Sequence, residues 1–319
     1  MTASHAAASP TPTLPEAVTD LPASVLVTGA TGFVGRHLVD SLRTAGVDVV
    51  GAADTVGDFF DVTDPHQVHE VFGRFKPEAV VHLGGVSGPM VSRDRPWSIV
   101  DVNIGGTANL LEAARISGTR RFILASSNAV YGGNPGPLDE QLAVSKPSTV
   151  YGATKVAGEH LVAVYGGRYG LSTCSLRISA VYGPGRTTHC IIGSFIRDAL
   201  AHRASRVEFG TDFARQYVYI DDVVRSIGCA LTAGPEADGQ AINVSGPELL
   251  DVGEIADIVV GLLPEARIEF GQGPDPDDDD IQGPFVLTRA KELLGFEPGV
   301  SLREGISRYV DHLRADNDG

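Results

Sequence analysis

The sequence predicts an α/β fold in which a doubly wound parallel sheet is followed by a smaller C-terminal α/β lobe. From Ser24 onward, short runs of β-branched and apolar residues alternate with longer segments of helical periodicity, which is the pattern of parallel strands joined by crossover helices. The short runs are apolar almost throughout, as expected when both faces of a sheet are covered. After about Ile178 the elements shorten and Pro and Gly become more frequent, which indicates the second lobe.

The strands and helices of the sheet can be placed in order along the chain. Strands are expected over 25–28, 47–53, 79–83, 121–126 and 172–178. Helices with apolar residues at helical spacing are expected between them, over 33–45, 67–75, 96–117 and 149–169. In the second lobe, Asp251 with Glu254 and Ser301 with Glu304 have the spacing of capping boxes, which predicts helices over 252–263 and after Ser301.

These elements divide the chain into three parts. Residues 1–22 are rich in Ala, Ser, Thr and Pro, and they are expected to form a flexible tail because they bury too little apolar surface to offset the entropy of ordering. Residues 23–178 are the expected cofactor-binding sheet domain, to which a segment at about 214–247 returns. Residues 179–213 and 248–319 are the expected substrate lobe.

Composition restricts the partners and the compartment. The 319-residue chain has 40 acidic and 25 basic residues and a formal charge of −15, so nucleic acid and anionic membranes should repel it. The N-terminal segment lacks the basic start and long apolar core of a signal peptide. Cys174, Cys190 and Cys229 are isolated and lack zinc-ligand spacing. We therefore expect a protein of the reducing cytoplasm without a metal site.

The stretch TGATGFVG places Gly29, Gly32 and Gly35 directly after the first strand and at the start of a helix. Glycines let the backbone turn tightly and approach a pyrophosphate, which then contacts the unpaired amides of the helix N-terminus. A tight turn without a ligand is the alternative. The strand, turn and helix context favours a Rossmann-like dinucleotide site.

Acidic residues after the second strand indicate which dinucleotide is bound. Asp54 ends that strand, where a carboxylate can accept both ribose hydroxyls and would repel a 2′-phosphate. This favours NAD over NADP, although Arg36 lies close to the glycine turn and Asp54 could instead cap a loop. Asp61 and Val62 follow in FFDVTD and are expected beside the adenine ring.

Three residues have the chemistry of an acid/base site. Tyr151 and Lys155 are four residues apart in an expected helix, so they share one helical face. A lysine ammonium beside a tyrosine favours the phenolate and lowers the phenol pKa toward the range of a general base. Ser127 follows an earlier strand at the edge where open α/β sheets bind ligands. Its hydroxyl could hold a substrate oxygen.

The order of several motifs resembles a known family. TGATGFVG, VVHLGG, DVNIGGTANLLEAA, SSNAVYG, YGATKVAGE, LRISAVYGPG, RQYVYIDDVV and INVSG follow one another as in the extended short-chain dehydrogenase/reductases, the NAD-dependent epimerase/dehydratase family. The resemblance covers residues 24–313. It implies that Ser127 is the catalytic Ser/Thr, Tyr151 the acid/base and Lys155 the ribose-binding residue that lowers the tyrosine pKa.

The resemblance also implies the remaining site. The strand end 82–85 lines the cofactor, and Asn103 organises the proton path. The expected cofactor contacts are Gly29, Thr31, Gly32, Phe33, Val34, Gly35, Asp54, Asp61, Val62, Leu83, Gly84, Gly85, Asn103, Ser126, Tyr151, Lys155, Ile178 and Val181. The expected substrate contacts are Val86, Ser87, Ser127, Asn128, Ser179, His189 and Arg215. Members of the family commonly form homodimers, here expected through helices 96–117 and 149–169.

The implied mechanism passes through a keto intermediate. Tyr151 would remove a proton from a substrate hydroxyl while the attached carbon delivers hydride to the nicotinamide of NAD. An epimerase would return the hydride to the opposite face, whereas a dehydrogenase would release the keto product and the reduced cofactor. Dehydration is disfavoured, because Asn128 and Ala129 replace the Asp-Glu pair of the dehydratases. An inactive NAD-binding regulator is less favoured, since such proteins typically lose the Tyr/Lys pair.

The substrate class stays open between two possibilities. Nucleotide-sugar enzymes of the family carry a phosphate-binding Arg, which Arg215 matches, but Ser179 replaces a usual Asn, and the position of a second Arg falls on 276–279, within the acidic run DPDDDD at 275–280. That run is expected to be a solvated loop. The family favours a nucleotide-sugar epimerase similar to UDP-glucose 4-epimerase, with phosphate held by cations such as Arg177, Arg186, Arg215 and Arg289. The alternative is an NAD-dependent dehydrogenase of a free sugar, sugar acid or lactone.

Overall fold

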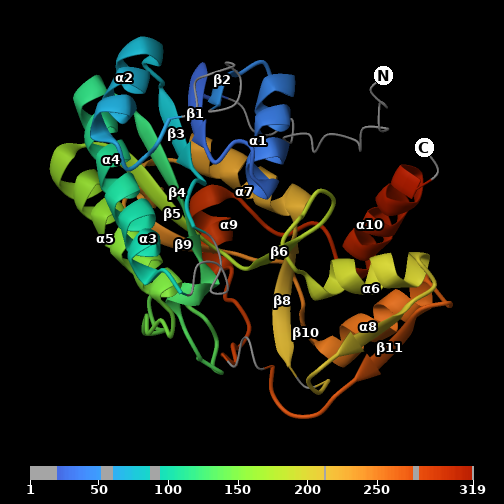
Figure 1. Cartoon of the computed structure of the whole chain (residues 1–319). Coiled ribbons are helices and arrows are strands. Elements are labelled where there is room, and N and C mark those ends of the chain that lie inside the picture. Colours follow the sequence, from blue (N-terminus) through green and yellow to red (C-terminus); the bar gives the residue numbers. More distant parts are fainter. Residues whose placement is uncertain (1–19, 52–59, 87–93, 212, 276–279, 318–319) are drawn as a thin grey trace.

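A six-stranded parallel sheet forms the centre of the protein (Figure 1). The computed structural model describes residues 20–51, 60–86, 94–211, 213–275 and 280–317. In spatial order the strands are β2 (Asp48–Gly51), β1 (Ser24–Thr28), β3 (Ala79–His82), β4 (Arg121–Ser127), β5 (Ser172–Ile178) and β9 (Gln240–Val244). Each neighbouring pair is parallel. The chain passes from β1 outward to β2 and then crosses to the other side of β1, so the strand order reverses between β1 and β3. Ligands of open parallel sheets bind in the crevice at such a reversal.

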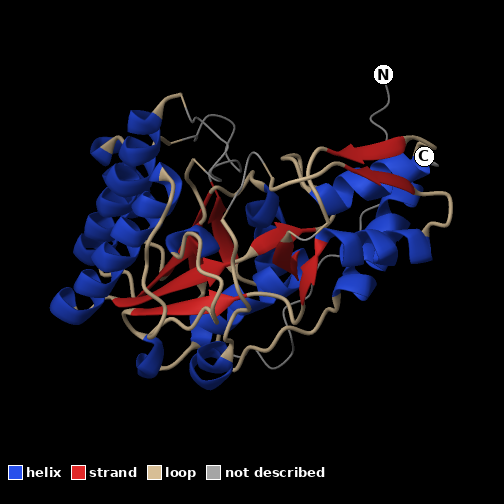
Figure 2. Ribbon diagram, turned by 90° about the horizontal axis from the view of Figure 1, so that it is seen from below, coloured by secondary structure: helices blue, strands red, loops and turns tan. Residues whose placement is uncertain are grey.

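Helices cover both faces of the sheet, as Figures 1 and 2 show. One layer contains α1 (Phe33–Thr44), α7 (Ile220–Thr232) and α9 (Thr288–Leu294), and the other contains α2 (Pro65–Phe75), α4 (Gly106–Ser117) and α5 (Val150–Tyr169). Side chains alternate between the layers. In β1, Val25 and Val27 belong to the core under α1 and α7, whereas Leu26 belongs to the core under α2 and α4. This two-sided burial explains the continuous apolar runs and confirms the predicted doubly wound fold.

The helix expected over 96–117 is not one continuous α-helix. It consists of α3 (Pro96–Val100), a π-helical turn (Asp101–Gly105) and α4. A π turn accommodates an extra residue per turn and often marks a functional site. Here it contains the buried Asn103, whose carbonyl accepts a 2.6 Å hydrogen bond from Thr107 Oγ1. The spacing of apolar residues in the sequence does not predict this π turn.

The C-terminal part is built from smaller sheets and three helices. Strands β6 (Ala180–Tyr182), β8 (Ala214–Tyr219) and β10 (Leu249–Asp251) form one sheet, and β7 (Ala204–Val207) pairs with β11 (Arg267–Phe270). The helices are α6 (Ile191–Leu200), α8 (Val252–Leu262) and α10 (Leu302–Asn317). The predicted capping box of Asp251 and Glu254 is present at α8. Figure 2 shows this part at one end of the molecule, beside the large sheet.

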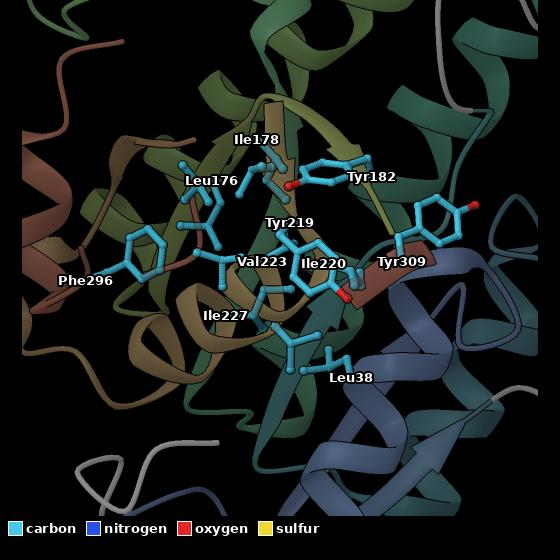
Figure 3. Packing of buried hydrophobic residues seen from close by; sticks show 14 of the residues in the cluster. Leu38, Leu176, Ile178, Tyr182, Tyr219, Ile220, Val223, Ile227, Phe296 and Tyr309 are labelled. Atoms are coloured by element: carbon cyan, nitrogen blue, oxygen red, sulfur yellow. The ribbon is translucent and has the colours of Figure 1, made fainter. Parts of the chain in front are cut away.

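One apolar core joins the two parts, as Figure 3 shows. Side chains from the large sheet, from α7 and from the C-terminal helices interdigitate there. The labelled members are Leu38, Leu176, Ile178, Tyr182, Tyr219, Ile220, Val223, Ile227, Phe296 and Tyr309. Because the core is continuous, the ends of β4 and β5 and the C-terminal segments are held in one arrangement.

Candidate active site

The glycine turn lies at the point where the strand order reverses. Gly29 has a φ of +70°, in the left-handed region, and a Cβ on it would lie 2.8 Å from the Gly84 amide nitrogen. A Cβ on Gly35 would lie 2.0 Å from the Gly29 carbonyl oxygen. Gly32 is the N-cap of α1 and has no side chain that could satisfy the first amides of the helix. The backbone therefore turns tightly here, and no side chain caps the first amides of α1, which fits a pyrophosphate.

The loop after β3 is bonded directly to the end of β1. The Thr28 hydroxyl accepts a 3.0 Å hydrogen bond from the Gly84 amide and bonds His82 Nδ1 at 2.7 Å. On its other side, His82 Nε2 lies 3.1 Å from Thr107 Oγ1. Complete burial, with the nearby Lys155 charge, lowers the pKa of His82 to about 3. His82 is thus a neutral link that fixes this edge of the sheet.

Asn103 anchors the next residues of the same loop. Its Oδ1 accepts a 2.9 Å hydrogen bond from the Val86 amide, and its Nδ2 donates to the Val86 carbonyl at 3.1 Å. Nδ2 also lies 3.0 Å from Thr154 Oγ1 on α5. A Cβ on Gly85 would lie 2.8 Å from Asn103 Oδ1, so only glycine leaves room for this contact. The π turn therefore ties the β3 loop to the helix that carries Tyr151.

Ser127 lies at the carboxyl end of β4, where a short 3-10 turn (Asn128–Val130) begins. Its Oγ accepts a 3.2 Å hydrogen bond from the Ala129 amide and donates a 3.2 Å bond to Asn128 Oδ1. The start of α5 packs closely on this turn, because a Cβ on Gly152 would lie 2.4 Å from the Ala129 carbonyl oxygen. The close contact places Tyr151 next to the turn that holds Ser127.

Tyr151 and Lys155 share one face of α5 as their spacing predicts. The Lys155 ammonium lies 5.6 Å from the centre of the Tyr151 ring and donates a 2.7 Å hydrogen bond to the Ala125 carbonyl of β4. Both side chains are buried. Burial lowers the pKa of Lys155 to about 8, although the negative charge of Glu159 raises it. The structure thus brings Ser127, Tyr151 and Lys155 together at the carboxyl edge of the sheet.

Residues 25–245 match the profile described as "NAD dependent epimerase/dehydratase family". The chain belongs to this family.

Individual members of the family resemble the chain over nearly its whole length. It is 33% identical to a UDP-glucose 4-epimerase of Mycolicibacterium smegmatis, covering 91% of this chain and 98% of the relative. It is 30% identical to a UDP-glucuronate 4-epimerase of Thermodesulfobacterium geofontis, covering 90% and 94%. Among solved structures, the UDP-glucose 4-epimerase of Thermus thermophilus in complex with NAD superimposes with a TM-score of 0.80 at 30% identity, covering 91% of this chain and 99% of that one.

A buried ion pair behind the site was not expected from the sequence. Glu159 accepts hydrogen bonds from the Arg177 guanidinium, the shortest at 2.8 Å, and from Ser126 Oγ at 2.5 Å. Arg177 also donates 2.9 Å to Tyr131 Oη. Its expected role as a phosphate contact is therefore wrong, because its guanidinium is buried between α5 and β5 and paired there. In the sequence, the four-residue spacing from Lys155 to Glu159 indicates only that Glu159 lies on the same face of the helix as the site residues.

Asp280, the last residue of the acidic run, is bonded to two other segments. The Asp280 carbonyl accepts a 2.8 Å hydrogen bond from Arg215, and its carboxylate accepts one of 2.5 Å from Ser148, just before α5. Asp280 is therefore bonded rather than free in solvent. Positions 276–279, where an Arg is missing, lie outside the described residues. Two other candidate cations bond protein groups: Arg186 bonds the carbonyls of Val181 and His189, and Arg289 bonds Gln240.

The other predicted contacts fall into three groups. Phe33, Val34, Val62 and Val181 are half-buried, and Ile178 and Ser179 are buried. The Ser179 hydroxyl accepts a 2.8 Å bond from Ser245. Thr31, Asp61 and His189 are exposed, and Asp54 and Ser87 lie outside the described residues.

Within the described ranges, no helix is both long and apolar enough to cross a membrane, and no group of three or more His, Cys, Asp or Glu side chains could hold a metal ion.

Proposed function

We propose that the protein is an NAD-dependent 4-epimerase of a nucleotide sugar, with UDP-glucose and UDP-glucuronate as the first candidates. The observation that carries this proposal is the grouping of Ser127, Tyr151 and Lys155 beside a glycine turn at the point where the strand order reverses. The choice of 4-epimerisation as the reaction follows the named activities of the relatives from M. smegmatis and T. geofontis.

The residues present fit NAD. The amides between Gly29 and Gly35 would hold the pyrophosphate, and Lys155 would hold the nicotinamide ribose. Asp54 would accept the adenosine ribose hydroxyls, a role proposed from its position in the sequence. Bound NAD would supply the acceptor and donor of hydride. The fit rests on the tight turn that these glycines allow, since a Cβ on Gly29 or Gly35 would collide with neighbouring backbone atoms, and on the first amides of α1, which no side chain caps.

Tyr151 would move the proton of the reaction. Its Oη would take the proton of the substrate hydroxyl and later return it, and the Lys155 charge favours the phenolate form that this requires. Ser127 Oγ would hold the same substrate oxygen. Asn128 and Ala129 supply no acid and base for loss of water, so dehydration is not part of the proposal.

A dehydrogenase of a free sugar, sugar acid or lactone is the second candidate. Arg215, the proposed phosphate contact, donates to the Asp280 carbonyl, and no Arg occupies 276–279. Carboxylates close to a diphosphate would repel it. This local charge favours a substrate without a pyrophosphate.

We also propose a homodimer formed by helices 96–117 and 149–169. Helices α3, α4 and α5 pack together at one side of the molecule (Figure 1). Their exposed large apolar side chains include Trp97, Ile116, Val164 and Tyr169. Val164→Lys should yield monomers in light scattering, whereas Val260→Lys, on α8 outside this surface, should not.

A cytoplasmic location is proposed because the three cysteines are free thiols.

A substrate panel tests the proposed function. The protein is incubated with UDP-glucose, UDP-glucuronate, free sugars and lactones, while product stereochemistry is followed by NMR and NADH by absorbance. Epimerised nucleotide sugar without NADH formation supports the proposal. Stoichiometric NADH from a free sugar or lactone would favour the dehydrogenase instead.

A further inference from the structure

Three side chains on one face of α5 lie along the end of β4. Tyr151, Lys155 and Glu159 follow one another at four-residue spacing, which puts them on the same face of the helix. Lys155 donates its 2.7 Å hydrogen bond to the Ala125 carbonyl. Glu159 contacts the next residue of the strand, because the Ser126 hydroxyl donates a 2.5 Å hydrogen bond to its Oε1. The helix is therefore joined to two consecutive strand residues, directly before the proposed catalytic serine.

The Glu159 carboxylate is fixed by a chain of buried side chains. Arg177 donates to both of its oxygens, at 3.0 Å from Nε to Oε1 and at 2.8 Å from Nη2 to Oε2. Its Nη1 donates to Tyr131 Oη at 2.9 Å, and Tyr131 in turn donates to Asn243 Oδ1 at 2.8 Å. All four side chains are buried. The position of the carboxylate is thus set from β5 and β9 as well as from α5.

Glu159 also brings a negative charge near the Lys155 ammonium. Among the described residues, the titratable and charged groups that face Lys155 are Tyr151 and Glu159 on α5, His82 on β3 and, paired with Glu159, Arg177 on β5. His82 is neutral, because burial lowers its pKa to about 3. Burial also lowers the pKa of Lys155, and the charge of Glu159 opposes this lowering. Without that charge, the ammonium would lose its proton at a lower pH.

We propose that Glu159 is a positioning residue of the reaction, which holds the end of β4 against α5 and keeps Lys155 in its cationic form beside Tyr151. This inference rests on the proposed function and deepens it. The carboxylate is bonded to Ser126 and Arg177, so it acts through Lys155 and not on the substrate. The Lys155 charge in turn favours the phenolate of Tyr151. The buried ion pair therefore serves the proton transfer as well as the stability of the fold.

The titration of Lys155 tests the charge effect without any substrate. The chain has four lysines, so NMR of protein labelled with carbon-13 at the lysine Cε atoms gives few signals, and the signal missing from Lys155→Met belongs to Lys155. In the wild type this signal should titrate at about pH 8. In Glu159→Gln the midpoint should lie about one pH unit lower. Equal midpoints in the two proteins would overturn the proposal.

A double variant keeps the test decisive if Glu159→Gln does not fold. Glu159→Gln alone leaves the buried Arg177 unpaired, whereas Glu159→Gln combined with Arg177→Met removes both charges, a replacement that proteins often tolerate. The Lys155 midpoint should again lie below that of the wild type. The reason is that Glu159 is one helical turn from Lys155, whereas Arg177 extends from β5 to Tyr131. A midpoint at or above the wild-type value would contradict the proposal.

The pH dependence of epimerisation gives the kinetic readout. With UDP-glucose, kcat/KM should fall as the pH rises through the pKa of Lys155, and in Glu159→Gln this fall should begin about one pH unit lower. The ratio of the variant to the wild type should therefore drop about sevenfold between pH 6.5 and 9. A purely structural role would lower kcat/KM by the same factor at both pH values, and that result would exclude the charge effect.

Ser126→Ala separates the hydrogen bond to β4 from the charge. It should lower kcat about tenfold at every pH, the scale of one hydrogen bond to a charged group, and leave the Lys155 midpoint unchanged. Glu292→Gln, at an exposed position on α9, is the control and should match the wild type in both measurements. Wild-type kcat in Ser126→Ala would refute the positioning of β4. If the wild type epimerises no nucleotide sugar, the proposed function fails, while the Lys155 titration still decides this inference.

Discussion

Lys155 lies with its ammonium 5.6 Å from the centre of the Tyr151 ring while it donates a 2.7 Å hydrogen bond to the carbonyl of Ala125. The hydrogen bond to β4 fixes the buried lysine beside the phenol. The position of Lys155 therefore depends both on its four-residue spacing from Tyr151 on α5 and on its contact with the end of β4. Burial lowers the pKa of the lysine to about 8. The charge that would favour the phenolate is therefore lost at moderately alkaline pH in the free protein.

Tyr151→Phe should lower epimerase turnover about a thousandfold, because it removes the group that exchanges the proton with the substrate. Turnover is measured with UDP-glucose by NMR. NAD bound to the purified protein should stay at the wild-type level, since the phenyl ring is kept. Turnover within tenfold of the wild type would exclude Tyr151 as the acid/base.

Lys155→Met should change how stability depends on pH. The folded-state pKa of Lys155, about 8, lies below the ordinary 10.5, so the buried charge opposes folding below pH 8 and this penalty is relieved as the pH rises toward 10.5. From pH 8 to 10.5 the wild type should gain about 3 kcal/mol relative to Lys155→Met. Urea unfolding at both pH values measures the difference, and parallel pH dependences would contradict the burial of this charge.

Glu159→Gln should destabilise the fold by about 3–5 kcal/mol, because it leaves the buried Arg177 guanidinium without its anion. The ion pair has a 2.8 Å contact with both side chains under 10% exposed. Chemical denaturation gives the free energy of unfolding. Glu292→Gln, on the exposed surface of α9, is the matched control and should change it by no more than about 0.5 kcal/mol. Similar values for both variants would show that the pair contributes little.

His82→Gln should remove part of the acid sensitivity of the protein. The pKa of His82 falls from 6.5 to about 3 on burial, so the unfolded chain binds this proton first, and the stability present above pH 6.5 is lost as the pH falls toward 3. Between pH 6.5 and 5 the wild type should lose about 2 kcal/mol more than His82→Gln. The free energy of unfolding at the two pH values provides the test. If both proteins lose the same amount, His82 does not stay neutral.

Much of the fold could be predicted from the sequence because local patterns determine it. The apolar runs of β1, β3, β4 and β5 were placed within two residues at each end, since strands buried on both faces need them. The glycine turn was also predictable, because its spacing in the sequence reflects a backbone requirement at Gly29 and Gly35. The grouping of Ser127 with Tyr151 and Lys155 followed from strand order and helical spacing.

The features that were missed depend on contacts between distant segments. Nothing local to Gln282 indicates that it will meet Asn128. Arg177 was expected at the substrate, because a sequence does not show that Glu159 faces it from α5. The π turn around Asn103 likewise depends on its partner Val86 in another loop. Such polar pairings arise only when the elements have packed.

The most direct test of the central claim uses UDP-glucose labelled with deuterium at C4 and the purified protein without added cofactor. If the protein removes hydride and returns it to the opposite face, UDP-galactose should form with the deuterium retained at C4 and without accumulation of NADH. Net NADH formation with a released keto sugar would contradict the epimerase, and so would loss of the label from C4 of the product.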